Sequence, residues 1–139
     1  MFRATRLGLV CAAALAAVAA AAPRGQQMME PTNNTRPYTQ EAFDAAAAQG
    51  KMILVDFYAP WCPVCRAQEP KVTSRLNADY KHVVAFRVDY DSNVALRKAM
   101  NVQKQSTLIL FEGRRELARL SYTSEDKAID ALFAHAKRS

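Results

Sequence analysis

The run Met52–Tyr58 restricts what this chain can fold into more than any other segment. Its side chains are apolar or aromatic apart from Asp56, and Ile53 and Val55 branch at Cβ. This composition is typical of a strand buried on both faces, in a sheet that helices cover on both sides. Side chains then recur at helical spacing at Val64, Gln68, Val72 and Leu76, which predicts a helix directly after the strand.

Helices and strands are predicted to alternate around this strand and helix. Thr39 can cap a helix that ends before Gly50, a residue that favours termination because it lacks a Cβ. Residues 82–89 have the pattern of a second strand, and residues 93–100 that of a short helix. We expect the inward-pointing side chains of this short helix to be Val94 and Leu96.

The C-terminal part predicts a hairpin followed by a helix. Residues 107–111 and 116–121 are joined by a short connection, so these two strands must be antiparallel. Ser124 is expected to cap the last helix, whose inward side chains are Ile129, Leu132 and Phe133. The order of elements predicts an α/β fold with a central mixed sheet of about four strands flanked by helices, in one domain of residues 38–139.

The N-terminus has the layout of a secretory signal peptide in residues 1–22. Arg3 and Arg6 precede an uncharged apolar segment, residues 7–22, which ends in small residues. The segment is shorter than the ~20 residues that cross a bilayer, so we favour a cleaved signal over an uncleaved membrane anchor. Residues 23–37 are polar and contain several prolines, which predicts a flexible leader. The chain is therefore expected to be periplasmic or secreted.

The charge balance argues against nucleic acid as a partner. The chain has 19 Lys and Arg against 13 Asp and Glu, a formal net charge of +6. Removal of the signal, with Arg3 and Arg6, would lower this to about +4. The basic residues are scattered and form no run interleaved with aromatic residues, which is typical of a solvated surface.

The cysteines favour a reactive rather than a structural role. Cys11 lies in the predicted signal, so Cys62 and Cys65 are the cysteines expected in the mature chain. Small secreted domains usually use disulfides as structural links. A bridge across two residues closes a very small loop, however, and constrains the unfolded chain little. This pair is therefore better suited to redox chemistry.

The position of the pair at the start of a helix supports this chemistry. Free N–H groups and the positive end of the helix dipole favour a thiolate there. We expect Cys62, as the more exposed of the two, to attack a partner disulfide, and Cys65 to release it one helical turn later. The pair would then form a redox disulfide. Pro63 suits the first turn, where its missing N–H costs nothing.

No metal or organic cofactor is expected at this pair. Tetrahedral zinc needs four ligands, and the chain has no second CxxC or CxxH motif. We interpret His82 and His135 as surface histidines. A thiolate site that holds a soft ion such as Cu(I) stays open as an alternative.

Residues 55–65, with the sequence VDFYAPWCPVC, resemble the active-site strand and loop of thioredoxins. The resemblance continues through residues 87–89 and 107–111 and covers nearly all of residues 39–136. It implies the thioredoxin fold and a monomeric protein-disulfide reductase that needs no cofactor. The segment is also similar to periplasmic thioredoxin-like domains, which implies oxidised protein substrates and a transmembrane electron donor.

The resemblance also implies roles for individual residues. The aspartate that matches Asp56 lies beneath the second cysteine in thioredoxins, so Asp56 is the expected acid or base for Cys65. Burial should raise its pKa. The alternative is an ion pair between Asp56 and Lys51 at a strand edge. Trp61 is implied as a contact surface for substrate, with plain packing as the alternative. The other residues of the predicted substrate-binding set are Pro63, Gln105, Ser106 and Thr107.

Ser106 is the main departure from the thioredoxin pattern, because the family has a cis-proline immediately before the strand at residues 107–111. A cis bond before a non-proline residue costs ~2.5 to 4 kcal/mol, so we expect the Gln105–Ser106 bond to be trans. This change is expected to weaken or redirect peptide binding. Ser121 is aligned with a second substrate-facing position, which is commonly a glycine in the family.

The sequence thus predicts an exported thiol-disulfide oxidoreductase that reduces disulfides in extracytoplasmic proteins. Three alternatives stay open: a disulfide oxidase or isomerase, a copper-handling protein, and a binding module with an incidental disulfide. The residues between the cysteines tune the balance of thiol and disulfide by an amount that sequence alone does not give.

Overall fold

The computed structural model describes residues 35–137. The elements along the chain are β1 (Thr35–Pro37), α1 (Gln40–Ala48), β2 (Met52–Tyr58), α2 (Pro63–Ala78), β3 (Val84–Asp89), α3 (Val94–Ala99), β4 (Thr107–Glu112), β5 (Arg115–Ser121) and α4 (Asp126–Ala134). The predicted signal peptide, Cys11 and most of the predicted leader lie outside the described residues. Within residues 35–137, no helix combines the length and apolar character needed to cross a membrane.

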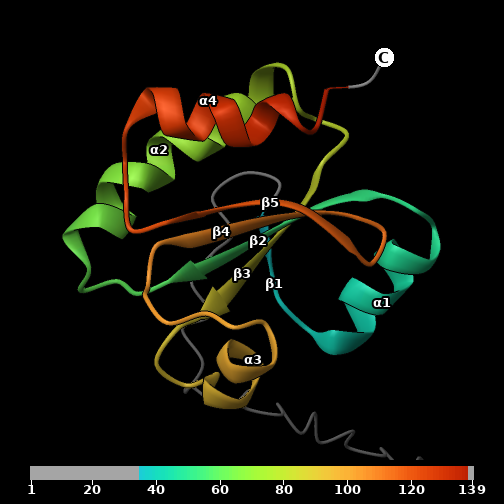
Figure 1. Cartoon of the computed structure of the whole chain (residues 1–139), viewed down its shortest axis with the longest axis horizontal. Helices are drawn as coiled ribbons and strands as arrows, with labels where there is room; N and C mark the ends of the chain where they lie inside the picture. The colour runs from blue at the N-terminus through green and yellow to red at the C-terminus, as the bar shows by residue number, and fades with distance from the viewer. Residues whose placement is uncertain (1–34, 138–139) are drawn as a thin grey trace, which may run out of the picture.

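The strands form one five-stranded mixed sheet in the order β1-β3-β2-β4-β5 (Figure 1). β1 and β2 run parallel to β3, whereas β4 runs antiparallel to both β2 and β5. β2 is therefore the central strand, and its Asp56 lies opposite Arg87 of β3 on one side and Leu108 of β4 on the other. This register places a basic residue beside the one acidic residue of the strand.

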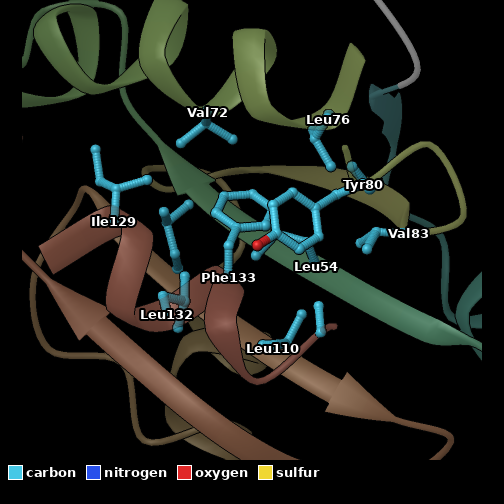
Figure 2. Packing of buried hydrophobic residues seen from close by; sticks show 12 residues of the cluster. Leu54, Val72, Leu76, Tyr80, Val83, Leu110, Ile129, Leu132 and Phe133 are labelled. Atoms are coloured by element: carbon cyan, nitrogen blue, oxygen red, sulfur yellow. The ribbon is translucent and has the colours of Figure 1, made fainter. Parts of the chain in front are cut away.

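Helices cover both faces of the sheet, as the composition of β2 predicts. In Figure 1, α2 and α4 lie on one face and α1 and α3 on the other. Leu54 packs with Phe133 of α4 in one apolar cluster (Figure 2), and Val55 packs with Phe43 of α1 in the other. Successive strand residues point to opposite faces, so Asp56 shares the face of Leu54 and points toward α2.

Several predicted elements are confirmed closely. The side chain of Thr39 accepts a hydrogen bond from the N–H of Ala42 at 3.1 Å, which caps α1 as predicted. Gly50 follows this helix with a φ of +64°, a conformation that favours glycine. The hairpin of β4 and β5 is antiparallel, and the inward side chains predicted for α4 are buried.

The prediction that residues 23–37 form a leader was wrong at its C-terminal end. Thr35–Pro37 is a strand, and it pairs with Ala85, Phe86 and Arg87 of β3. Three residues with a proline carry no strand pattern of their own. The pairing comes from the open edge of β3, which accepts the extended chain. The sheet therefore has five strands rather than about four.

Two smaller predictions also need correction. Ser124 does not cap α4: the N-cap is Glu125, and it makes no side-chain capping bond. The carbonyl of Ser124 instead accepts a hydrogen bond from Lys71 at 2.7 Å. Val94 does not point inward but is 44 % exposed, whereas Leu96 packs against the cluster around Phe43 as predicted.

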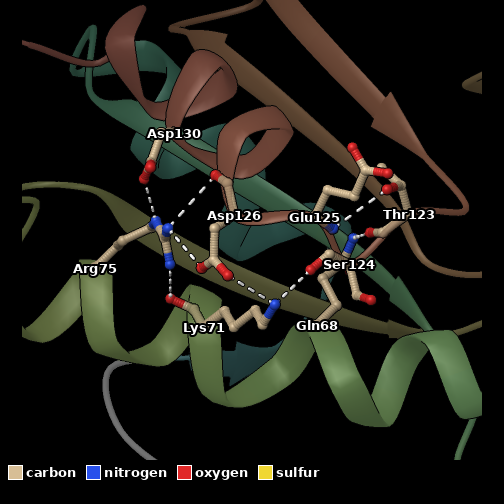
Figure 3. Close-up of polar contacts among 8 residues, drawn as sticks. All are labelled: Gln68, Lys71, Arg75, Thr123, Ser124, Glu125, Asp126 and Asp130. Atoms are coloured by element: carbon tan, nitrogen blue, oxygen red, sulfur yellow. Dashed lines mark hydrogen bonds and ion pairs between the residues drawn. The ribbon is translucent and has the colours of Figure 1, made fainter.

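Polar side chains of α2 hold the loop between β5 and α4 (Figure 3). The buried Gln68 donates to the carbonyl of Thr123 at 2.7 Å, and Lys71 donates to that of Ser124 at the same distance. Arg75 makes ion pairs with two aspartates of α4. The loop after β5 is thereby fixed against the same helix that begins at the two cysteines.

Candidate redox site

The end of β2 delivers Cys62 to the start of α2. The chain turns at residues 59–62, where the N–H of Cys62 donates to the carbonyl of Ala59 at 3.1 Å. Cys62 is the N-cap of α2, and its Sγ accepts a hydrogen bond from the N–H of Cys65 at 3.2 Å. Pro63 occupies the first helical turn, where it leaves no hydrogen bond unmade. The sulfur thus occupies the place of a capping oxygen at the positive end of the helix.

Both cysteines are buried thiols, with exposed fractions of 0 % for Cys62 and 1 % for Cys65. The prediction that Cys62 is the more exposed of the two was therefore wrong. The pair packs with Tyr58 and Ala59 in a small cluster at the end of β2, and Val64 lies against it. The two sulfurs differ in their hydrogen bonding rather than in their exposure.

Cys65 strongly favours the thiol form in this environment. Burial raises its pKa to about 12, and the hydrogen bond with Cys62 and the negative charges of Cys62 and Asp56 act in the same direction. A group that receives the proton of Cys65 is therefore needed before its sulfur can act as a nucleophile at neutral pH.

Asp56 is buried in the centre of the sheet, with 6 % of its surface exposed. Burial raises its pKa from 3.8 to about 6, against the lowering effect of Arg87. The guanidinium of Arg87 donates to Oδ2 of Asp56 from Nε at 3.2 Å and from Nη2 at 3.1 Å. The predicted alternative, a pair with Lys51 at a strand edge, was wrong. Asp56 and Cys65 interact electrostatically, which fits the predicted proton transfer between them.

Arg87 connects Asp56 to a second carboxylate that the sequence did not indicate. Its Nη1 donates to Oε1 of Glu69 at 2.6 Å, and the hydroxyl of Tyr58 donates to the other oxygen of Glu69 at 3.3 Å. The guanidinium also lies over the ring of Tyr58, 4.1 Å from its centroid. Helical spacing places Glu69 one turn beyond Cys65, a signal that is visible only once Arg87 is known to face the helix.

Trp61 is exposed beside the buried pair. Its side chain is 54 % exposed, and its Nε1 donates to Asp91 at 2.6 Å. Plain packing, the alternative for Trp61, does not describe a ring this accessible. Pro63 is exposed as well, so both residues are accessible to a substrate that approaches Cys62.

The segment 105–107, which the sequence predicts to belong to the substrate-binding set, is mostly buried. Gln105 is half-buried, whereas Ser106 and Thr107 are buried. The Gln105–Ser106 bond is trans, as predicted, and Ser106 has a φ of +57°. Its N–H donates to Phe57 at 2.8 Å and its carbonyl accepts from Tyr122 at 2.9 Å. The backbone of Ser106 is therefore already paired within the chain. Its hydroxyl is buried with no hydrogen-bond partner within residues 35–137.

Tyr122 is a candidate contact residue that sequence reasoning missed. It has a φ of +54°, is 45 % exposed, and lies under the ammonium group of Lys104 at 5.3 Å from the ring centroid. A left-handed φ is the conformation that favours glycine, so the glycine-like position is Tyr122 rather than Ser121. Its N–H donates to the carbonyl of Ser106, and the N–H of Ser106 donates to Phe57 near the C-terminal end of β2. Tyr122 therefore lies at the end of the sheet from which the chain leads to the cysteines.

The described residues contain no group of three or more His, Cys, Asp and Glu that could hold a metal ion. Two adjacent thiols at a helix start can pass two electrons and two protons to a partner disulfide and become joined by a disulfide bond themselves.

The comparisons with known proteins agree with this site. The thioredoxin family model matches residues 34–135. Thioredoxin-1 of Saccharomyces cerevisiae is 30 % identical over 98 residues, which cover 70 % of this chain and 94 % of the yeast protein. Thioredoxin of Chlamydia trachomatis serovar D is 34 % identical with the same two coverages. The crystal structure of Trxlp from Edwardsiella tarda superposes with a TM-score of 0.67 at 36 % identity, over 70 % of this chain and 97 % of that one.

The fold and the cysteine pair define a thiol-disulfide oxidoreductase. The chain belongs to the thioredoxin family, with the thioredoxin fold in a five-stranded version.

Substitution of Asp56 by Asn is expected to stabilise the protein in a pH-dependent way. The folded chain retains the carboxyl proton up to about pH 6, whereas the unfolded chain loses it near pH 3.8. The ionised form therefore lowers the free energy of unfolding as the pH rises through this window. At 1.36 kcal/mol per pKa unit, the free energy of unfolding of Asp56→Asn should exceed that of the parent by about 3 kcal/mol at pH 8. Below pH 4 the two proteins should be equally stable. Urea unfolding at both pH values measures this; an equal gain at both would contradict it.

Substitution of Tyr122 by Gly is expected to raise stability and weaken substrate binding together. The left-handed conformation destabilises a non-glycine residue by roughly 1–2 kcal/mol, and glycine has no such cost. The same change removes an exposed ring that follows β5 and is proposed to contact substrate, so KM for a peptide disulfide should rise while kcat changes little. Asn101→Gly is the control, because Asn101 also has a positive φ, of +51°. It should leave KM unchanged; an equal rise in KM for both variants would contradict a contact role for Tyr122.

Proposed function

We propose that this protein reduces disulfides in extracytoplasmic proteins, with Cys62 as the nucleophile, Cys65 as the resolving cysteine and Asp56 as its proton acceptor. The observation that carries the proposal is the arrangement of the two sulfurs: the N–H of Cys65 donates to Sγ of Cys62 at the start of α2. Sγ of Cys62 thus lies at the positive end of the helix, whereas burial holds the proton on Cys65. The two cysteines are therefore suited to different steps.

The cycle has two exchange steps. The thiolate of Cys62 attacks one sulfur of a substrate disulfide, which forms a mixed disulfide and releases the other substrate sulfur as a thiolate that takes up a proton. Asp56 then accepts the proton of Cys65, and the new thiolate attacks Sγ of Cys62. This breaks the mixed disulfide, releases the second substrate sulfur as a thiolate that takes up a proton, and leaves a disulfide between Cys62 and Cys65. Two electrons have passed from the cysteine pair to the substrate.

Substrate contact is proposed at the exposed surface around the buried pair. Trp61 and Pro63 flank Cys62 in the sequence and are exposed. Gln105 is half-buried in the loop before β4, and the exposed Tyr122 follows β5 and is bonded to Ser106. The side chains of Ser106 and Thr107, which the sequence placed in this set, are buried, so their role is to shape the loop. Because the backbone of Ser106 is already paired internally, we propose that aromatic contacts carry more of the binding than backbone pairing does.

Export and an external electron source complete the proposal. Arg3, Arg6 and the apolar residues 7–22 support a cleaved signal peptide, which would place the domain in the periplasm or the medium. Each turnover leaves the pair oxidised, so a reductant must restore it. A transmembrane thiol donor is the class of partner that can supply electrons outside the cytoplasm. No nucleic acid, metal or organic cofactor takes part in the proposed cycle, and the domain acts as a monomer.

The direct test is to trap substrates with Cys65→Ser in the full-length chain, expressed in a bacterial host. We expect the variant in the periplasmic fraction, lacking residues 1–22, and linked to other proteins through Cys62. The adducts should disappear on reduction.

Cys62→Ser is the matched control, and it should form few adducts. Adducts that form mainly through Cys65 in the control would contradict the assigned roles. An intact N-terminus together with cytoplasmic protein would contradict export without affecting the chemistry.

A further inference from the structure

The geometry of the contact between Arg87 and Asp56 is unusual for an arginine and a carboxylate. Such pairs commonly engage both carboxylate oxygens with two parallel N–H donors. Here both donors, Nε and Nη2, reach the same oxygen, Oδ2, at 3.2 and 3.1 Å. The other oxygen, Oδ1, is buried and has no hydrogen-bond partner within residues 35–137.

Glu69 accounts for this one-sided contact. Its Oε1 holds Nη1 of Arg87 at 2.6 Å, the shortest of the guanidinium contacts. Glu69 is itself held, because its Oε2 accepts from the hydroxyl of Tyr58 at 3.3 Å. The ring of Tyr58 lies under the guanidinium at 4.1 Å and restricts its plane. A guanidinium fixed in this way uses Nε and Nη2 on Oδ2 and Nη1 on Glu69, and none of its five N–H groups reaches Oδ1 of Asp56.

We propose that Glu69 is a positioning residue that holds Arg87 on a single oxygen of Asp56 and so keeps Oδ1 free for the proton of Cys65. The inference rests on the proposed function, since it deepens the role of Asp56 in the resolving step. Glu69 touches neither substrate nor sulfur in this account. It acts through its contact with Arg87 and through its negative charge.

The charges of Arg87 and Glu69 shift the pKa of Asp56 in opposite directions. Arg87 faces it from β3, Glu69 and Cys65 face it from α2, Tyr58 lies on the same strand, and β4 contributes the uncharged Leu108. Two carboxylates therefore share one guanidinium. The negative charge of Glu69 raises the pKa of Asp56 and opposes the effect of Arg87. A carboxylate with a raised pKa is the better proton acceptor for a thiol.

The proton transfer balances within the site. The proton of Cys65 moves to Oδ1 of Asp56, and the electron pair of the S–H bond stays on sulfur. That thiolate forms the bond to Sγ of Cys62 as the mixed disulfide breaks, and the substrate sulfur leaves with the electron pair. The substrate disulfide is the oxidant, and no other reactant is needed.

The test compares Glu69→Gln with the parent protein. Glutamine keeps the shape and can still accept from Arg87, but it lacks the charge. We expect the pKa of the Asp56 carboxyl, followed by its carbon chemical shift, to fall below the parent value of about 6. The pH at which the resolving rate reaches half its maximum should fall with it. The rate at the plateau should fall roughly threefold or more, because a weaker base accepts the proton less well.

Glu69→Ala and Glu116→Gln provide the second variant and the control. In Glu69→Ala the guanidinium is free to take both oxygens of Asp56, so the resolving rate should fall further than in Glu69→Gln. Glu116→Gln removes the same charge from an exposed pair with Arg119 on β5, and it should match the parent in both the titration and the rate.

Asp56→Asn separates failure of this proposal from failure of the proposed function. If Asp56→Asn resolves as fast as the parent, Asp56 is not the proton acceptor and both proposals are wrong. If Asp56→Asn is slow but Glu69→Gln leaves the Asp56 titration and the rate profile unchanged, the role of Glu69 alone is overturned. Glu69→Gln keeps the side-chain volume, so a folding failure of Glu69→Ala does not remove the test.

Discussion

Burying an ionised carboxylate in the middle of a sheet costs several kcal/mol unless the charge is paired, and the arrangement around the cysteines follows from how this chain pairs Asp56. The parallel register of β2 and β3 sets Arg87 directly opposite. The guanidinium is then held by Glu69 and Tyr58 on the side of α2. Pairing is incomplete, since one oxygen of Asp56 is left without a partner in the described part of the chain. A buried acid with a pKa near 6 is the result.

The two neighbouring sulfurs of α2 lie in different environments. At the N-cap, Sγ of Cys62 accepts the N–H of Cys65 and lies at the positive end of the helix. One turn further, burial keeps Cys65 in the thiol form. The difference between the two sulfurs is thus a matter of position along α2, because both are equally hidden from solvent. In the proposed cycle Asp56 allows Cys65 to react with Cys62, because it points toward this helix and carries an oxygen that can take the proton of Cys65.

Much of the fold was predictable because the signals were local. The bounds of β2, the cap at Thr39 and the antiparallel hairpin each depend on a few neighbouring residues. β1 was missed because it forms by pairing with the distant β3, and a three-residue segment with a proline has no strand pattern of its own. The cap at Ser124 was wrong because α4 begins at Asp126, which makes Glu125 the N-cap and places Ser124 one residue before it.

The candidate site shows the same difference between local signals, which were found, and long-range contacts, which were missed. The cysteine pair and Asp56 were found from their pattern, since a carboxylate inside an apolar strand is conspicuous. Glu69 and Tyr122 were missed because each matters through one contact or one backbone angle, the first with Arg87 and the second a φ of +54°. The exposure expected for Cys62 was wrong because Tyr58, Ala59, Val64 and Tyr90 pack around the pair. Sequence pattern therefore indicated the candidate residues, whereas their burial and contacts became visible only in the structure.

The measurement that tests the central claim most directly is the reduction potential of the Cys62–Cys65 pair, determined by equilibration with glutathione. A pair whose second thiol is buried and reluctant to ionise has no strong stabilisation of its reduced form, so its disulfide should be hard to reduce. We predict a value near that of thioredoxins, about −270 mV. A value near −120 mV, typical of a strong oxidant, would contradict the account and would make this protein a disulfide oxidase.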